Sequence, residues 1–184
     1  ISSVEMTIQL RHMIKTISKG LFIAIWYLMI LSLVPGCTQN DDQQEFEREA
    51  FNRPENFTET RDNGEIVDGN DDPDDWRISP FYQGTLSIDP PFPNPVLSTE
   101  RITLILLVTG VDAVNGFRVF VLYDETNYVP IYEEFRSPLP PGVNTVTLDA
   151  RSIARFEENP EGLYRLIIED LRGNVISYGD VKIN

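Results

Sequence analysis

The side chains of this 184-residue sequence that could do chemistry are almost all carboxylates. There is one histidine, His12, and one cysteine, Cys37. A zinc site built from histidine and cysteine needs several such ligands, so the sequence does not support one. Two carboxylates that converge in a cleft with separated pKa values could act as acid and base. That is the catalytic chemistry this composition leaves open.

One acidic stretch has the spacing of a metal-binding loop. Asp68, Asn70 and Asp72 alternate as the first oxygen ligands of a calcium loop do. The sixth position is Pro73 instead of glycine, and the twelfth is Ser79 instead of a bidentate glutamate. We therefore expect a solvated acidic turn, and we treat Asp68, Asn70 and Asp72 as a weak calcium candidate.

The N-terminal region has the order of features that marks an export signal. Basic residues precede an apolar run over residues 21–34, and small residues follow it. The basic residues are Arg11, Lys15 and Lys19. A helix of about 14 residues rises about 21 Å, less than the roughly 30 Å hydrocarbon core of a bilayer. We predict a signal peptide over residues 1–36. Met13 begins a more typical signal, which leaves open that residues 1–12 are upstream sequence translated in error.

The end of this segment, Val34-Pro35-Gly36-Cys37, resembles the lipobox of bacterial lipoproteins. In that family a small residue precedes a cysteine that is diacylated and becomes the new N-terminus. The resemblance implies that Cys37 carries a diacylglyceryl group and that the protein is attached to a membrane through it. An uncleaved signal anchor with an incidental cysteine is the alternative.

Cleavage before Cys37 would sharpen what the composition excludes. The mature chain would keep no histidine and no free thiol, which excludes Ser-His-Asp and Cys-His catalysis and disulfides. It would hold 12 basic and 28 acidic residues, a net charge of about −16. Such a chain repels nucleic acid, so we expect no nucleic-acid partner. We also expect no cofactor and no enzymatic activity.

The residues after Cys37 are polar and acidic, with little to bury. We predict a lipidated acidic tether over residues 37–75, mostly disordered. Asp41, Asp42 and Glu45 resemble the acidic export signal that follows the cysteine in surface-exposed lipoproteins of Bacteroidetes. This resemblance implies an outer-membrane protein displayed on the cell surface, with a periplasm-facing anchor as the alternative.

From Trp76 onward, short apolar stretches alternate with turn residues, a pattern typical of a β-sandwich. The expected strands are residues 81–88, 101–109, 117–123, 127–135, 143–148, 162–169 and 175–183. We expect 101–109 to be a central strand buried on both faces, and Pro130 to place its strand at a sheet edge. Residues 89–95 are not expected to pair, because prolines lack N–H donors. Trp76 is expected to pack at the edge of the core.

Several motifs in this region form a recognisable series. They are Pro93-Asn94-Pro95, residues 119–124 (VFVLYD), residues 162–166 (GLYRL) and Gly173-Asn174-Val175. Together they are similar to the Ig-like domain of flagellar hook-capping proteins and to the C-terminal sorting domains of type IX secretion cargo. The resemblance implies a seven-stranded immunoglobulin-like β-sandwich, which we place over residues 76–184. We do not expect a sorting role, because the chain carries its own lipobox.

These features predict a lipid-anchored, non-enzymatic cell-envelope protein whose sandwich is a protein-interaction or accessory module. Its partners would be the membrane, through the lipid on Cys37, and an envelope protein. A surface module that binds carbohydrate or calcium is the alternative. Exposed aromatic side chains beside carboxylates, at Trp76, Phe92 or Tyr128, would favour that alternative. A carboxylate-based hydrolase is a third hypothesis, which the small size disfavours.

Overall fold

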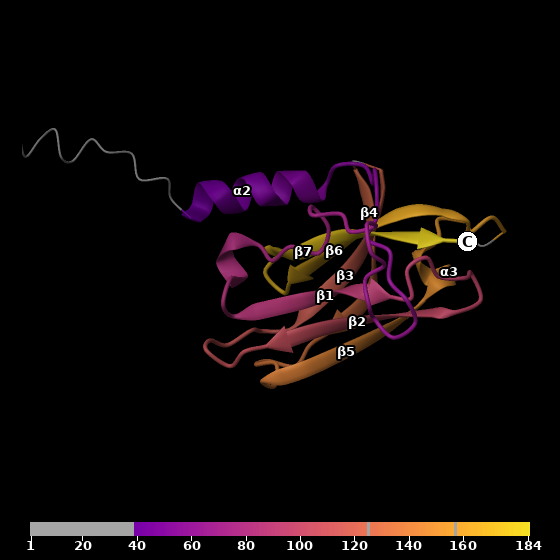
Figure 1. Ribbon diagram of the computed structural model, residues 1–184. Coiled ribbons are helices and arrows are strands. Elements are labelled where there is room, and N and C mark those ends of the chain that lie inside the picture. The colour runs from indigo at the N-terminus through magenta and orange to yellow at the C-terminus, as the bar shows by residue number, and fades with distance from the viewer. Residues whose placement is uncertain (1–38, 125, 157) are drawn as a thin grey trace, which may run out of the picture. The chain divides into compact units, whose positions relative to one another are not determined.

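The computed structural model describes residues 39–124, 126–156 and 158–184, which fold into two antiparallel sheets (Figure 1). The first sheet has the strand order β1-β2-β5, and the second has the order β4-β3-β6-β7. The strands are β1 (Leu86–Phe92), β2 (Arg101–Val108), β3 (Phe117–Asp124), β4 (Asn127–Glu134), β5 (Gly142–Asp149), β6 (Gly162–Asp170) and β7 (Val175–Ile183). The helices are α2 (Gln39–Ala50), α3 (Ala150–Ile153) and the 3₁₀ turn η1 (Pro80–Tyr82). The prediction of an all-β fold with two packed sheets is confirmed.

The core lies between the two sheets and is filled by alternate residues of each strand. In β2, every second residue from Ile102 to Val108 is buried. The opposite face of β2 is open, and Leu107 is 41% exposed there. The prediction that this strand is buried on both faces is therefore wrong, although the strand is central in its sheet. Its apolar residues outnumber the positions that the core can cover.

Two expectations about prolines had different outcomes. Pro130 lies in β4, which is at the edge of its sheet as predicted. The prolines after Asp89 do not end β1, because the strand resumes with Phe92 opposite Thr103 after a register shift. The prediction that residues 89–95 would not pair is wrong at this point. β1 is an edge strand, where a residue without an N–H donor removes no bond on its outer side.

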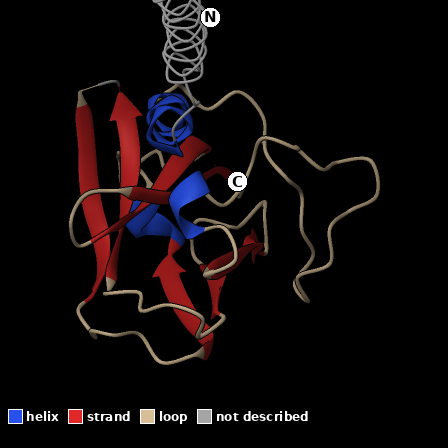
Figure 2. Cartoon of the chain, turned by 90° about the vertical axis from the view of Figure 1, so that its left-hand side faces the viewer, coloured by secondary structure: helices blue, strands red, loops and turns tan. Residues whose placement is uncertain are grey.

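The predicted disordered tether is instead folded onto the sandwich in all its described part. In α2, Gln43, Phe46 and Ala50 are buried, a spacing that places them on one face of a helix. Figure 2 shows this helix on the outside of the strands. Phe46 packs on Tyr178 of β7 with the ring centroids 5.0 Å apart. The tether prediction missed the docking of this helix, because two apolar side chains are sufficient for it.

The stretch between α2 and η1 is also ordered by hydrogen bonds and burial. Thr58, Thr60 and Asp75 are buried, and Thr60 bridges to Asn94. Trp76 belongs to the main core, which confirms its predicted packing. No helix among the described residues is long and apolar enough to cross a membrane.

Candidate functional site

A buried ion pair joins β6 and β7 beneath the end of α2. Arg165 and Asp180 are register partners, and their side chains are 10% and 1% exposed. Arg165 donates from Nε to Oδ1 of Asp180 at 2.7 Å and from Nη2 to Oδ2 at 2.9 Å. Its Nη1 donates to the backbone carbonyls of Glu49 and Asn52, both at 3.2 Å. The guanidinium therefore caps the C-terminal end of α2, where the helix dipole favours a cation.

A second carboxyl group holds the chain that follows α2. Asp75 accepts hydrogen bonds from the backbone N–H of Thr58 and from that of Asp180, both at 2.9 Å. Burial, reinforced by the nearby charge of Asp180, raises the pKa of Asp75 to about 7. Burial also raises the pKa of Asp180, against the opposing effect of Arg165. Two acids and one arginine thus share a site of low solvent access.

Asn94 completes this arrangement, which we call the buried polar cluster: Arg165, Asp180, Asp75 and Asn94. Its amide nitrogen donates to the carbonyls of Thr58 and Asp180 at 2.9 and 3.0 Å. Its amide oxygen accepts the backbone N–H of Lys182 at 2.9 Å. The cluster connects the stretch after α2 to the last strand, and each of its side chains has a protein partner.

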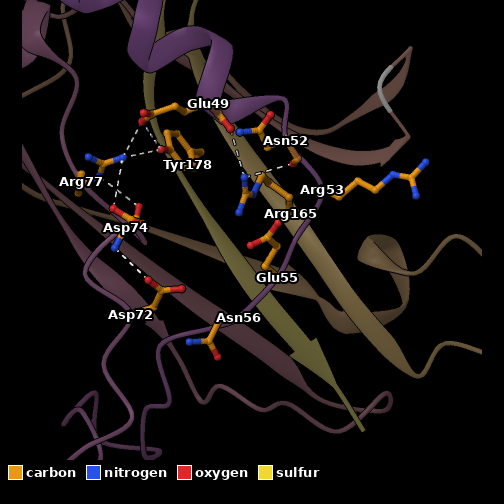
Figure 3. Close-up of a pocket in the computed structure, with 10 residues that line it drawn as sticks. All are labelled: Glu49, Asn52, Arg53, Glu55, Asn56, Asp72, Asp74, Arg77, Arg165 and Tyr178. Carbon is orange, nitrogen blue, oxygen red and sulfur yellow. Dashed lines mark hydrogen bonds and ion pairs between the residues drawn. The ribbon is translucent and has the colours of Figure 1, made fainter.

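A polar cavity of about 230 Å³ opens beside this cluster (Figure 3). Its lining residues are Glu49, Asn52, Arg53, Glu55, Asn56, Asp72, Asp74, Arg77, Arg165 and Tyr178. Arg77 donates to Glu49 at 2.8 Å and to the hydroxyl of Tyr178 at 2.6 Å. The two arginines deepest in this network, Arg77 and Arg165, are thus engaged by the protein itself. The lining contains no histidine, cysteine or serine, and the contacts drawn in Figure 3 hold α2 against β7.

The other distinctive feature is the free edge of the three-stranded sheet. β5 pairs with β2 in eight uninterrupted register pairs, without a proline or a bulge. Residues 143–148 make no backbone hydrogen bond to any described residue outside β2. The one charged residue of β5, Asp149, is paired with Arg101 at 2.8 Å. On the outer face beside this edge, Val143 is 67% exposed.

The remaining sheet edges are each protected. β1 carries Pro90 and Pro91 with a register shift, and β4 carries Pro130 with two register shifts. The edge of β7 is covered, because the N–H groups of Trp76 and Ser79 donate to Tyr178 and Ile176 at 2.8 and 2.9 Å. Proteins usually block or bend a free strand edge, since an open one pairs with other chains. The edge of β5 is therefore a candidate binding surface.

Some of the site residues predicted from the sequence lie outside the described residues, and others lie within them. Cys37 and the lipobox residues Val34, Pro35 and Gly36 lie outside the described residues. Asp41, Asp42 and Glu45 are exposed on α2, and their role as an export signal stays a prediction.

The calcium candidate residues serve local contacts. The Asn70 amide donates to Glu59, and Asp72 accepts the backbone N–H of Asp74 at 3.0 Å. Asp68 is exposed. Within the ranges that the structure describes, no group of three or more histidine, cysteine or acidic side chains could hold a metal ion.

The buried polar cluster was not predicted from the sequence. A signal for it exists: Arg165 and Asp180 are opposite charges inside two largely apolar strands that were expected to form a hairpin. Only the register, with its shift between Ile168 and Glu169, makes them partners. Comparison of the chain with known proteins finds no matching protein family, no matching curated protein and no matching solved structure.

Proposed function

We propose that this protein is a lipid-anchored, non-enzymatic component of the bacterial outer membrane whose sandwich binds another envelope protein. The observation that carries the proposal is the order of two features in one chain. A lipobox-like sequence ends at Cys37, and the folded unit begins at Gln39. The folded unit would then be the part that the lipid holds at the membrane.

The immunoglobulin-like character of the sandwich is part of this proposal. In the constant-type domain, the fourth strand pairs with the fifth and completes a four-stranded sheet. Here the fourth strand, β4, pairs with β3 in the opposite sheet. This exchange leaves β5 at an edge, which supports an interaction role for a domain of this type.

The binding mode that fits an open, regular and nearly uncharged edge is strand addition. An extended segment of a partner would continue the ladder of β5, with its alternate side chains facing Val143 and Leu107. Backbone hydrogen bonds would supply affinity, and the apolar outer face would supply selectivity. This is the protein-binding surface that we assign to the module.

Surface display remains the leading location, with a periplasm-facing anchor as the alternative. The exposure of Asp41, Asp42 and Glu45 on α2 is compatible with recognition by an export machinery. For the carbohydrate- or calcium-binding alternative, Trp76 offers no surface because it is buried. Tyr128 is 40% exposed, and its ring also packs on Phe51 and Phe120 with centroids 5.4 and 5.0 Å apart. The alternative therefore loses Trp76 and keeps Tyr128.

Three measurements on cells test the proposal. Mass spectrometry of the N-terminal peptide should find a diacylated Cys37, and protease treatment of intact cells should remove the sandwich if it is displayed outside. A photo-crosslinking side chain at Thr145 of β5 should capture one envelope protein. The matched control is the same group at the exposed Thr99, outside the strands. An unmodified Cys37, or equal capture at both positions, would contradict the proposal.

A further inference from the structure

The folding of α2 changes what a lipid on Cys37 would do. Only Thr38 lies between Cys37 and the first residue of α2. A residue spans at most about 3.6 Å, so Cys37 is held within about 7 Å of that helix start. A disordered stretch of 38 residues would have allowed more than 100 Å. The consequence of this short spacing rests on the proposed lipidation of Cys37.

The start of α2 lies at one particular end of the sandwich. The Gln43 amide nitrogen donates to the carbonyl of Val175, the first residue of β7, at 3.1 Å. Its amide oxygen accepts the backbone N–H of Phe81 in η1 at 3.2 Å. The other end of α2 is bound by Arg165, further along the sheet. In Figure 1 the start of α2, η1 and the end of β2 all lie on the left.

Four chain segments meet at this end, which we call the anchor end: residues 80–85, 109–116, 135–141 and 171–174. Hydrogen bonds join three of them, and the side chain of Leu171 in the fourth lies beside Gly116. Thr109 donates from Oγ1 to the carbonyl of Gly84 at 2.9 Å, and the N–H of Leu139 donates to the carbonyl of Val114 at 2.7 Å. The anchor end is therefore one continuous surface.

Large apolar side chains project from this surface. Val111 is 81% exposed, Phe135 is 61% exposed and Phe81 is 40% exposed. Exposed apolar side chains gathered in one region mark a binding surface. The four segments carry two arginines, Arg136 and Arg172, against one aspartate. On a chain with a net charge of −14, a surface that is apolar and not acidic is an exception.

The opposite end of the sandwich has the reverse character. Residues 52–75 contain nine acidic and two basic side chains. This stretch reaches the far end, where Thr60 bridges to Asn94 just beyond β1. Leu97 is 52% exposed nearby. Placed against lipid phosphates, this end would meet strong repulsion.

We propose that the anchor end lies on the lipid surface, with Val111, Phe135 and Phe81 among the headgroups, and that the acidic stretch of residues 52–75 faces away from the membrane. The bilayer would be zwitterionic, with ethanolamine headgroups. Asp41 and Asp42, at the start of α2, would meet their ammonium groups, while the positive end of the helix dipole offsets the two acidic charges. The free edge of β5 then rises from the membrane and stays open to a partner.

The test uses the processed, lipidated protein in vesicles of phosphatidylethanolamine and phosphatidylcholine. Because the lipid would occupy the thiol of Cys37, a cysteine introduced elsewhere is the one reactive thiol. Val111→Cys, Phe135→Cys and the control Leu97→Cys each receive an environment-sensitive fluorophore. Nitroxide groups on the lipid headgroups then quench the fluorophores that lie near the membrane.

We expect quenching at positions 111 and 135 to be at least threefold stronger than at position 97. Equal quenching at the three positions, with a diacylated Cys37 confirmed by mass, would overturn the orientation and leave the lipid anchor standing. A chain without lipid on Cys37 that fails to float with the vesicles would overturn both. Val111 is so exposed that its replacement should not disturb folding, which a thermal melt of each variant checks.

Discussion

The outer faces of the two sheets differ in what covers them. The face of β6 and β7 is covered by α2, and the stretch after the helix is held there by the buried polar cluster. The face of β2 and β5 is bare and exposes Leu107 and Val143. The first face fixes the domain beside its N-terminal segment, and the second is left free for a partner. Each sheet also carries one cross-strand Arg–Asp pair, buried in the first case and exposed in the second.

That contrast gives the largest expected effect. Arg165→Met leaves Asp180 buried without its cation, close to Asp75, and should lower the free energy of unfolding by about 3–5 kcal/mol. Arg101→Met removes the exposed pair with Asp149 and should cost less than about 1 kcal/mol. Urea denaturation of both variants measures the difference. Equal losses of unfolding free energy in the two variants would show that the buried pair stabilises the fold no more than the exposed pair does.

The covering helix should separate from the sandwich when its apolar contact is removed. Phe46→Ala should cost about 2–3 kcal/mol, below the usual range for a buried phenylalanine because a terminal helix can undock alone. Leu107→Ala, on the bare face, should change stability by less than about 1 kcal/mol. Limited proteolysis should cut Phe46→Ala before residue 76 and leave the strands intact. Unchanged resistance of residues 39–75 would contradict the docking of α2.

The free energy of unfolding should depend on pH, because two buried carboxyl groups near the covered face, Glu169 and Asp75, have raised pKa values. Burial, with Asp170 and Glu47 adding to it and Arg118 opposing it, raises the pKa of Glu169 to about 7, and Asp75 has a similar value. Both values exceed those of the unfolded chain, so the folded state binds more protons between about pH 4 and 7.

The free energy of unfolding should therefore fall as pH rises from 5 towards 8, by about 2–3 kcal/mol for each of the two groups. Urea denaturation at the two pH values measures this change. Glu169→Gln should remove part of the slope, because its side chain cannot ionise. A protein equally stable at both values, or more stable at pH 8, would show that these carboxyl groups are not buried as described.

The smallest effect on stability belongs to the free edge. Thr145→Lys places a charge on the outer face of β5 and should change the free energy of unfolding by less than about 0.5 kcal/mol. Capture of the partner by a probe elsewhere on β5 should nevertheless be lost, because a lysine at an edge opposes strand addition. Retained capture would place the partner on another surface. Thr99→Lys is the matched control.

Six of the seven strands were predictable because their sequences alternate and their turns carry glycine and proline, whereas the first was placed at residues 81–88 and lies at Leu86–Phe92. Pro130 marked the edge position of β4, and alternation in residues 143–148 matched the buried Asn144, Val146 and Leu148. The exposure of one face of β2 was not predictable, because the residues on that face are largely apolar, like those on the buried face. Burial on one face depends on what the rest of the chain places there, which a strand sequence does not contain.

The covered face could not be foreseen, for a related reason. Two apolar side chains of α2 dock on Phe120, Ile167 and Tyr178, which lie at least 70 residues away in the sequence. The docking of the helix could not be inferred from its acidic sequence, because the residues that it contacts are brought together by the sheet. The same holds for Arg165, whose role follows from the register with Asp180 and from the carbonyls of α2.

The most direct test of the account is hydrogen–deuterium exchange of the processed protein in vesicles, followed through the N-terminal peptide of residues 37–50. The mass of this one peptide reports the lipid on Cys37, and its exchange reports the state of α2. We predict a diacylated peptide whose amides after Gln43 exchange as slowly as those of the outer strands. A diacylated peptide that exchanges at the rate of an unfolded chain, while β7 stays protected, would restore a flexible tether and contradict the account.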